Sequence, residues 1–233
     1  MHTPKSACFG DGSVTPEQIV DAALAVGLEA IAITDHNSAE ATDEMRWVAA
    51  GRGLDIFPGI ELSTVGGHIV ALFPLNTPLA ELRDFLNYAG LDWQQWGDSI
   101  NMTSGDTEEA LRKIHERGGL AIAAHVERWP SGFLETQQPR AVKVAIHASD
   151  YLSALEITIP GNKPRWNAGT VRGYSRKRAC TQGSDAHALG EIGRRPVYIR
   201  MESVSLDALR EAIRDYETAI RFPGELGCET KSA

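Results

Sequence analysis

The chain has 233 residues, of which 42% are hydrophobic and 23% are charged. This composition is ordinary for a globular protein and excludes disordered, collagen-like and coiled-coil architectures. The longest apolar runs, such as Gly118–Ala124, are too short to span a bilayer, and the start lacks a signal-peptide pattern. We therefore expect one domain over residues 1–233 and no association with a membrane.

The net charge limits the possible binding partners, and the spacing of the cysteines indicates the cellular compartment. The chain carries 23 Lys and Arg residues against 31 Asp and Glu residues, a net charge of −8. An acidic surface disfavours duplex nucleic acid as a partner. Cys8, Cys180 and Cys228 are too far apart for a zinc finger or a disulfide framework, so we expect a reducing, cytoplasmic environment.

Strand-like and helical stretches alternate along the chain. Thr15 predicts a helix start, because Pro16 follows it and Gln18 completes a capping box. Further helices are expected over residues 39–52, 78–88, 107–117 and 205–220, and strands over 30–34, 55–62, 68–73, 120–124, 154–158, 179–181 and 197–200. Residues 87–106 and 130–147 are expected as loops. Repeated strand–helix units favour a mainly parallel sheet covered by helices.

Histidines and carboxylates gather where these strands end, and the carboxyl ends of barrel strands lie on one face. The clusters are His2, Thr34-Asp35-His36, Glu61 with His68, His125, and Ser184-Asp185-Ala186-His187. Imidazole and carboxylate groups together suit zinc, manganese or iron. Glu61 is the natural bridging ligand, since its two oxygens can reach two ions. His115, His147 and Cys180 lack such partners, so we expect structural roles for them.

Six segments of the chain resemble the polymerase-and-histidinol-phosphatase family, the PHP domain, and together they cover nearly its whole length. The second and fourth motifs are the most specific of them. The segments are residues 2–4 with 11–17, 33–37, 58–61, 68–70, 124–125 and 183–187. The resemblance implies an α/β fold, a distorted (βα)7 barrel with a site for two or three divalent ions that hydrolyses phosphoesters.

Carried over by position, the resemblance also implies how the ligands are shared. His2, Glu61 and Asp185 would hold one ion, and Glu61, His68 and His125 a second. His36 and His187 would hold a third, together with a ligand from the following loop, for which Asp11 is favoured over Cys8. Asp35 would orient a neighbouring group. The metals expected are manganese, zinc or iron.

The chain departs from the family pattern at two places. The third motif usually continues His-Pro, whereas here His125 is followed by Val126. The first histidine of the family's His-x-His motif would precede Met1, which implies that the first barrel strand is largely missing. We interpret this as trimming of a longer protein, because a barrel without that strand has an open edge.

A small phosphorylated substrate suits such a site. A metal-activated water would attack the phosphorus, and His187 or a third ion would help the leaving group depart. Lys5 and Arg128 follow predicted ligands by three residues and are candidates to bind phosphate. Arg165 and Arg172 belong to a stretch, residues 157–184, that lacks acidic residues. That stretch is either an approach for an anionic substrate or a solvated basic loop.

Trp129 and Trp166 are candidates to stack on a nucleobase. The favoured function is therefore hydrolysis of a phosphomonoester, a nucleotide or an oligonucleotide end. A non-catalytic or regulatory PHP module remains an alternative, since the missing histidine favours it. A metal-dependent amidohydrolase is a second alternative, although its usual carbamylated lysine has no evident place at a strand end. The sequence does not indicate an oligomeric state.

Overall fold

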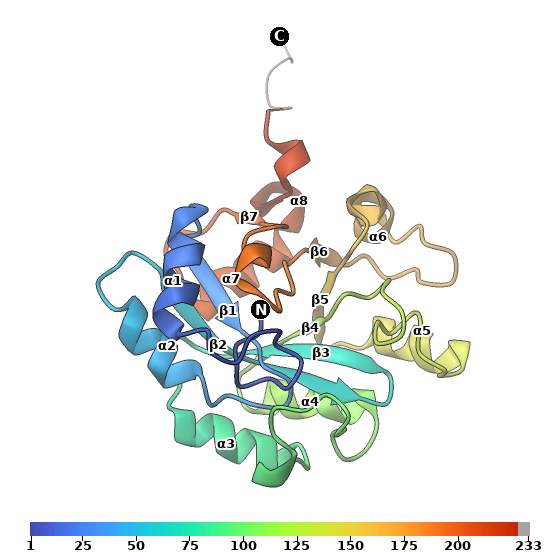
Figure 1. The fold of residues 1–233 in the computed structure, drawn as a ribbon. Coiled ribbons are helices and arrows are strands. Elements are labelled where there is room, and N and C mark those ends of the chain that lie inside the picture. Colours follow the sequence, from blue (N-terminus) through green and yellow to red (C-terminus); the bar gives the residue numbers. More distant parts are fainter. Residues whose placement is uncertain (228–233) are drawn as a thin grey trace.

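The computed structural model describes residues 1–227, so that Cys228 lies outside the described residues. Six strands form one curled sheet in the order β1 to β6 (Figure 1). Their bounds are β1 Ala30–Ile33, β2 Asp55–Thr64, β3 Gly67–Leu72, β4 Leu120–Ala123, β5 Leu152–Glu156 and β6 Ala179–Thr181. Two short strands, β7 Tyr198–Ile199 and β8 Ile220–Arg221, pair separately. The arrangement confirms the expected α/β class and is consistent with a distorted PHP-type barrel.

The sheet is mixed rather than mainly parallel. The pairs β1–β2, β4–β5 and β5–β6 are parallel, whereas β3 runs antiparallel to both β2 and β4. A turn of only two residues joins β2 to β3, and so short a connection cannot make a parallel crossover. The reversal matters for function, because it brings the start of β3 to the edge where β2 and β4 end.

Eight α-helices are described within residues 1–227. Their bounds are α1 Pro16–Ala25, α2 Thr42–Ala49, α3 Leu79–Tyr88, α4 Thr107–Glu116, α5 Arg140–Ala148, α6 Lys163–Ala168, α7 Leu206–Arg214 and α8 Tyr216–Ala219. The Thr15 capping box is present, with both reciprocal hydrogen bonds formed. Two expectations were wrong: α5 lies in the predicted second loop, and the single closing helix is divided at Asp215.

Two buried clusters hold the helices on the sheet. The smaller one joins α1 and α2 to β1, with Ile19, Ile33 and Met45 at its centre. The larger one covers β2 to β6 and includes Leu209 of α7 and Phe222 near the end of the described chain. Residues from the last third of the chain therefore share a core with the strands that precede them.

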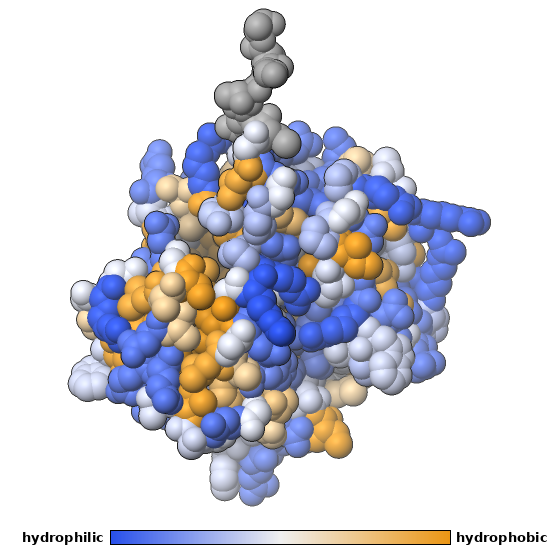
Figure 2. Space-filling view, turned by 45° about the horizontal axis from the view of Figure 1, so that its top comes forward, coloured by the Kyte–Doolittle hydropathy of each residue, from blue (hydrophilic) through white to orange (hydrophobic). Residues whose placement is uncertain are grey.

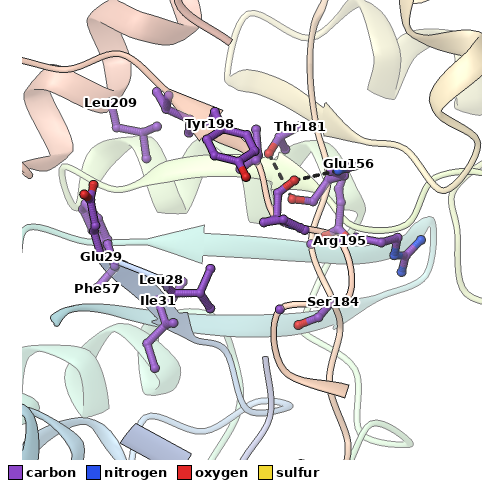
Figure 3. Close-up of a pocket in the computed structure, with 18 of the residues that line it drawn as sticks. Leu28, Glu29, Ile31, Phe57, Glu156, Thr181, Ser184, Arg195, Tyr198 and Leu209 are labelled. Carbon is purple, nitrogen blue, oxygen red and sulfur yellow. Dashed lines mark hydrogen bonds between the residues drawn. The ribbon is translucent and has the colours of Figure 1, made fainter. Parts of the chain in front are cut away.

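The curled sheet does not close. Its edge strands β1 and β6 border a cavity of about 840 Å³. Figure 3 shows Leu28 and Ile31 on one side of this cavity, and Tyr198 and Leu209 come from the elements across it. Met1 occupies one end, where its amino group donates to the Ala32 carbonyl at 3.1 Å.

Hydrophilic residues cover most of the face shown in Figure 2, and hydrophobic residues form a band on its left and smaller patches elsewhere. Among residues 1–227, every helix is too short or too polar to cross a membrane.

Candidate metal centre

Five imidazole rings form a continuous row at one edge of the sheet. The centroid distances are 4.4 Å from His187 to His2, 4.5 Å from His2 to His36, 4.9 Å from His36 to His68 and 5.3 Å from His68 to His125. The predicted convergence of these strand ends is therefore present. His68 takes part because antiparallel β3 starts at this edge, a reason that the sequence analysis did not foresee.

Glu61 lies at the centre of the row and is almost completely buried. Its Oε1 atom is 2.7 Å from Nδ1 of His68 and 3.0 Å from Nε2 of His125, and its Oε2 atom is 3.3 Å from Nε2 of His2. An ionised carboxylate only accepts hydrogen bonds, and these three nitrogens lie at distances from which an imidazole N–H donates them. Each carboxylate oxygen of Glu61 thus lies beside at least one imidazole nitrogen. A carboxylate that bridges two metal ions requires such a partner ligand beside each oxygen.

His2 and Asp185 form the next part of the site. Nε2 of His2 lies 3.0 Å from Oδ1 of Asp185, and the other oxygen of Asp185 accepts a hydrogen bond from Arg128. Asp185 and His125 both adopt positive φ values, 47° and 28°. Such backbone is costly for residues with side chains, and its presence at two candidate ligands points to a functional constraint.

The third group joins His36 and His187 to the loop after His2. Ligand atoms of His2, Cys8, His36 and His187 all lie within 4.8 Å of one another. Asp11, the loop ligand favoured from the sequence, is not in this group: its carboxylate is exposed and accepts hydrogen bonds from the backbone and hydroxyl of Ser13. The structure brings Cys8 here in its place.

The charges of the site depend on one another. Burial lowers the pKa of His2, but hydrogen bonds to Asp185 and Glu61 outweigh this effect and raise it to about 9. Burial raises the pKa of Glu61, yet its bonds to His125, His2 and His68 bring it well below the usual value. The ring of His36 forms no hydrogen bond to a carboxylate among the described residues, and burial lowers its pKa to about 4. Burial and nearby carboxylates raise the pKa of Cys8 to about 11.

These residues fit a group of divalent cations. Two carboxylates, four imidazoles and one thiol form three overlapping groups of three or four ligands. Nδ1 of His36 and Nδ1 of His125 are buried with no hydrogen-bond partner among the described residues. Unpartnered buried polar atoms are costly, and a bound ion is one of the few remedies. A proton on a ring nitrogen that binds an ion would leave as the ion binds.

Asp35 holds the loop that follows His2. Its carboxylate is fully buried and accepts hydrogen bonds from the backbone and the hydroxyl of Thr3, both at 2.7 Å. Burial raises its pKa, and the two bonds from Thr3 lower it in part. Asp35 thus fixes the position of Thr3, the residue that follows His2. The orienting role expected of it stays a prediction.

The candidate substrate residues fall in different places. Arg128 is beside Asp185, and Lys5 is exposed in the loop after His2. Arg165 on α6 and Arg172 after it are exposed, and neither forms a hydrogen bond or an ion pair with the row of histidines as described. The prediction for Trp166 was wrong: this side chain is buried and packs against His147. Trp129 is 74% exposed.

Glu156 was not predicted from the sequence. This residue ends β5, and its Oε1 atom is buried with no partner among the described residues. Burial raises its pKa. Glu156 borders the cavity together with Glu61 and Asp185, and Figure 3 shows it beside Thr181. Its place at the end of a buried strand was the available signal, as it had been for Glu61.

Two family profiles match the chain. Residues 1–159 match the PHP domain, and residues 174–218 match the PHP-associated family. The first match covers more than half of the chain, so this protein belongs to the PHP domain family. The resemblance found in the sequence motifs is thereby confirmed.

Particular relatives are similar over part of their length. An uncharacterized protein of Methanocaldococcus jannaschii is 32% identical over 117 residues, which are 50% of this chain and 55% of the relative. The 5′-3′ exoribonuclease Rnm of Salmonella typhimurium is 37% identical over 91 residues, 37% of this chain and 30% of the relative. The alignments thus span about half of the first relative and less than a third of the second.

Solved structures share the fold. The lesion-specific endonuclease Q of Pyrococcus furiosus superposes with a TM-score of 0.70 at 16% identity, covering 94% of this chain and 56% of that one. A two-domain protein of Bacteroides vulgatus, which contains a predicted PHP-like metal-dependent phosphoesterase, gives a TM-score of 0.63 at 20% identity, covering 95% and 63%. At these identities the likeness shows the fold, which is that of PHP-like metal-dependent phosphoesterases.

Proposed function

We propose that this protein is a metal-dependent phosphoesterase that hydrolyses a small phosphomonoester, a nucleotide or an oligonucleotide end. The observation that carries the proposal is Glu61, a buried carboxylate held between His2, His68 and His125. Membership of the PHP family supports a hydrolase and leaves the substrate open. The similarity to an exoribonuclease supports a nucleotide-like substrate.

The protein's own groups supply positioning and charge. Divalent ions, when bound, would polarise the phosphoryl oxygens and provide a nucleophilic water at neutral pH. Glu61, Asp185 and the imidazoles would hold those ions, and the hydrogen bond that Nδ1 of His187 donates to the Asp185 carbonyl would fix that ring. Arg128 pairs with Asp185 in this structure. It would be free to bind phosphate in a bidentate manner once Asp185 is engaged by a cation.

Neighbouring residues favour a substrate that carries a base. Trp129 follows Arg128 directly and is 74% exposed, so its ring is available for stacking beside a phosphate-binding group. The net charge of −8 disfavours a long duplex. A nucleotide or a single-stranded end therefore suits this surface better than duplex nucleic acid does.

The test is a hydrolysis panel with the protein loaded in turn with manganese, zinc and iron. The substrates are an aryl phosphate, sugar phosphates, nucleoside monophosphates, single-stranded oligonucleotides and duplexes. We expect metal-dependent release of phosphate or of terminal nucleotides, with duplexes cleaved least. If no phosphoester is hydrolysed by the metal-loaded protein, the proposal fails and a non-catalytic module is supported.

A further inference from the structure

The loop between His2 and α1 presents a sulfur atom to two imidazoles. Cys8 lies on this loop, and its Sγ atom is within 4.8 Å of ligand nitrogens of His36 and His187. A thiol is a different kind of donor from the oxygen of Asp11, the ligand favoured from the sequence. The identity of this one atom affects which metals the site prefers.

The backbone fixes the position of Cys8. The amide of Ala7 donates to the Gly97 carbonyl at 2.7 Å, and the amide of Gly10 donates to the His187 carbonyl at 2.9 Å. Phe9 is buried beside it. The loop is therefore attached to the protein on both sides of Cys8. These hydrogen bonds fix the position of the thiol near the histidines.

His187 is oriented to use its outer nitrogen. Its Nδ1 atom lies 2.7 Å from the backbone carbonyl of Asp185. A carbonyl only accepts, so Nδ1 donates this hydrogen bond and Nε2 is the ring atom left to bind a metal. This arrangement is the usual one for a metal-binding histidine, whose other ring nitrogen donates to a carbonyl or a carboxylate.

His36 provides independent evidence for a ligand. Its side chain is 94% buried, since its exposed fraction is 6%. Its Nδ1 atom has no hydrogen-bond partner, and neither nitrogen of the ring forms a hydrogen bond among the described residues. Leaving a buried polar group unpaired is costly. An ion at this place would satisfy the ring.

His2 completes the group only in part. Its Nε2 atom faces Asp185 at 3.0 Å and Glu61 at 3.3 Å, and its Nδ1 atom lies 3.3 Å from the hydroxyl of Ser6. Nε2 of His2 thus already contacts the carboxylates of Asp185 and Glu61. Cys8, His36 and His187 remain as three ligands with a fourth position open.

We propose that Cys8, His36 and His187 form a sulfur–nitrogen metal site that selects zinc over manganese and magnesium. The inference rests on the metal centre of the proposed function but assigns its own ligand set and metal preference. Thiolate favours soft and borderline cations, and three protein ligands with an open position are typical of catalytic zinc. The thiol proton would leave to solvent as the sulfur–metal bond forms.

Cobalt(II) is a direct probe, because a thiolate bound to it gives an intense sulfur-to-cobalt charge-transfer band in the near ultraviolet. The full chain is titrated with cobalt and then competed with zinc and with manganese. We expect the band in the unmodified protein, its loss in Cys8→Ser, and its retention in Asp11→Asn and in Cys180→Ala. Zinc should displace cobalt, whereas manganese at the same concentration should not.

Binding affinities provide the second readout. Loss of a residue that only hydrogen-bonds to a metal ligand already weakens metal binding by about 10-fold. Cys8→Ser removes a ligand itself, so it should weaken zinc binding by at least about 10-fold. It should change manganese binding far less. Cys8→Asp should restore metal binding without the charge-transfer band. Since Cys8 is exposed, these substitutions should leave the melting temperature of the metal-free protein unchanged. Zinc should also protect Cys8 from alkylation, as measured by mass spectrometry.

A charge-transfer band that persists in Cys8→Ser, or equal zinc affinities of Cys8→Ser and the unmodified protein, would overturn this inference. The phosphoesterase proposal would survive that result if the unmodified protein still binds ions at Glu61 and hydrolyses a phosphoester. Failure of the unmodified protein to bind any divalent ion would instead overturn both proposals.

Discussion

Nε2 of His2 lies 3.0 Å from Oδ1 of Asp185, although 183 positions separate the two residues in the sequence. The backbone makes this pairing possible. The amide of His2 donates to the carbonyl of Ala186, and the amide of Thr34 donates to the carbonyl of Met1. The first two residues therefore join the chain after β1 to the chain after β6, at one end of the opening between the two strand edges.

The first prediction concerns Glu61. Glu61→Gln keeps the shape of the side chain but removes the charge that two ions would share. Activity toward the best phosphoester should fall by more than about 100-fold, because loss of an outer-shell partner alone costs 10–100-fold. Metal content, measured by mass spectrometry after dialysis, should fall too. Glu44→Gln, on the exposed side of α2, is the matched control and should change neither quantity.

The second prediction concerns Arg128. Arg128→Ala should raise the KM for a phosphoester by about 10-fold, the effect of losing a charge-assisted hydrogen bond of roughly 1.5 kcal/mol. Metal affinity should not fall, because Arg128 competes with cations for Asp185 in this structure. Steady-state kinetics and calorimetry measure the two effects. Arg112→Ala, on α4, is the control. An unchanged KM would remove Arg128 from the substrate site.

The third prediction concerns the basic stretch. Arg165 and Arg172 are both exposed, and we expect them to attract further phosphates of a nucleotide. Replacing both with Ala should raise the KM for nucleotides by a few-fold and leave simple aryl phosphates nearly unchanged. Other basic residues of the stretch have structural contacts: Lys163 pairs with Glu225, and Arg178 donates to the carbonyls of His147 and Leu152. An equal response of both substrates would indicate a structural stretch.

The fourth prediction concerns pH and stability. Burial lowers the pKa of His147 from 6.5 to about 4. Between these values the unfolded chain binds a proton that the folded chain does not, so the free energy of unfolding falls as the pH drops through this window. The slope from one such group is at most about 1.4 kcal/mol per pH unit.

Urea unfolding at pH 7, 6 and 5 measures this effect. His147→Phe, which keeps a ring against Trp166 and Tyr174, should lose less stability between pH 7 and pH 5 than the unmodified protein. Part of the dependence should remain, because His36 has a similarly lowered pKa. His115→Gln, on the exposed face of α4, should behave as the unmodified protein does. Identical slopes for His147→Phe and the unmodified protein would contradict the account.

Local signals in the sequence predicted most of the elements. The capping box at Thr15 and the apolar run of β4 depend on neighbours along the chain, and both are found as expected. Helix α5 was missed because Pro139 begins it without a side-chain cap, and only Ile146 and His147 of its residues are fully buried. The antiparallel direction of β3 depends on a short turn and on pairing with distant strands, which hydrophobic patterns do not reveal.

The site was predictable in its residue types but not in all of its contacts. The meeting of Glu61, near the end of β2, with Asp185, in the segment after β6, could be inferred, because the carboxyl ends of barrel strands lie on one face. The choice of Cys8 in place of Asp11 could not, since it depends on a loop held by Gly97 and His187 from elsewhere in the chain. The burial of Trp166 depends in the same way on His147 and Tyr174.

The most direct test of the account is a crystal structure of the metal-loaded protein, with anomalous scattering measured at two energies to identify each ion. The account predicts ions at the row of histidines, with the two oxygens of Glu61 each about 2.0–2.2 Å from a separate ion. His2 and Asp185 should bind one of these ions, and His68 and His125 the other. A metal-replete crystal in which Glu61 lies more than about 4 Å from every ion would contradict it.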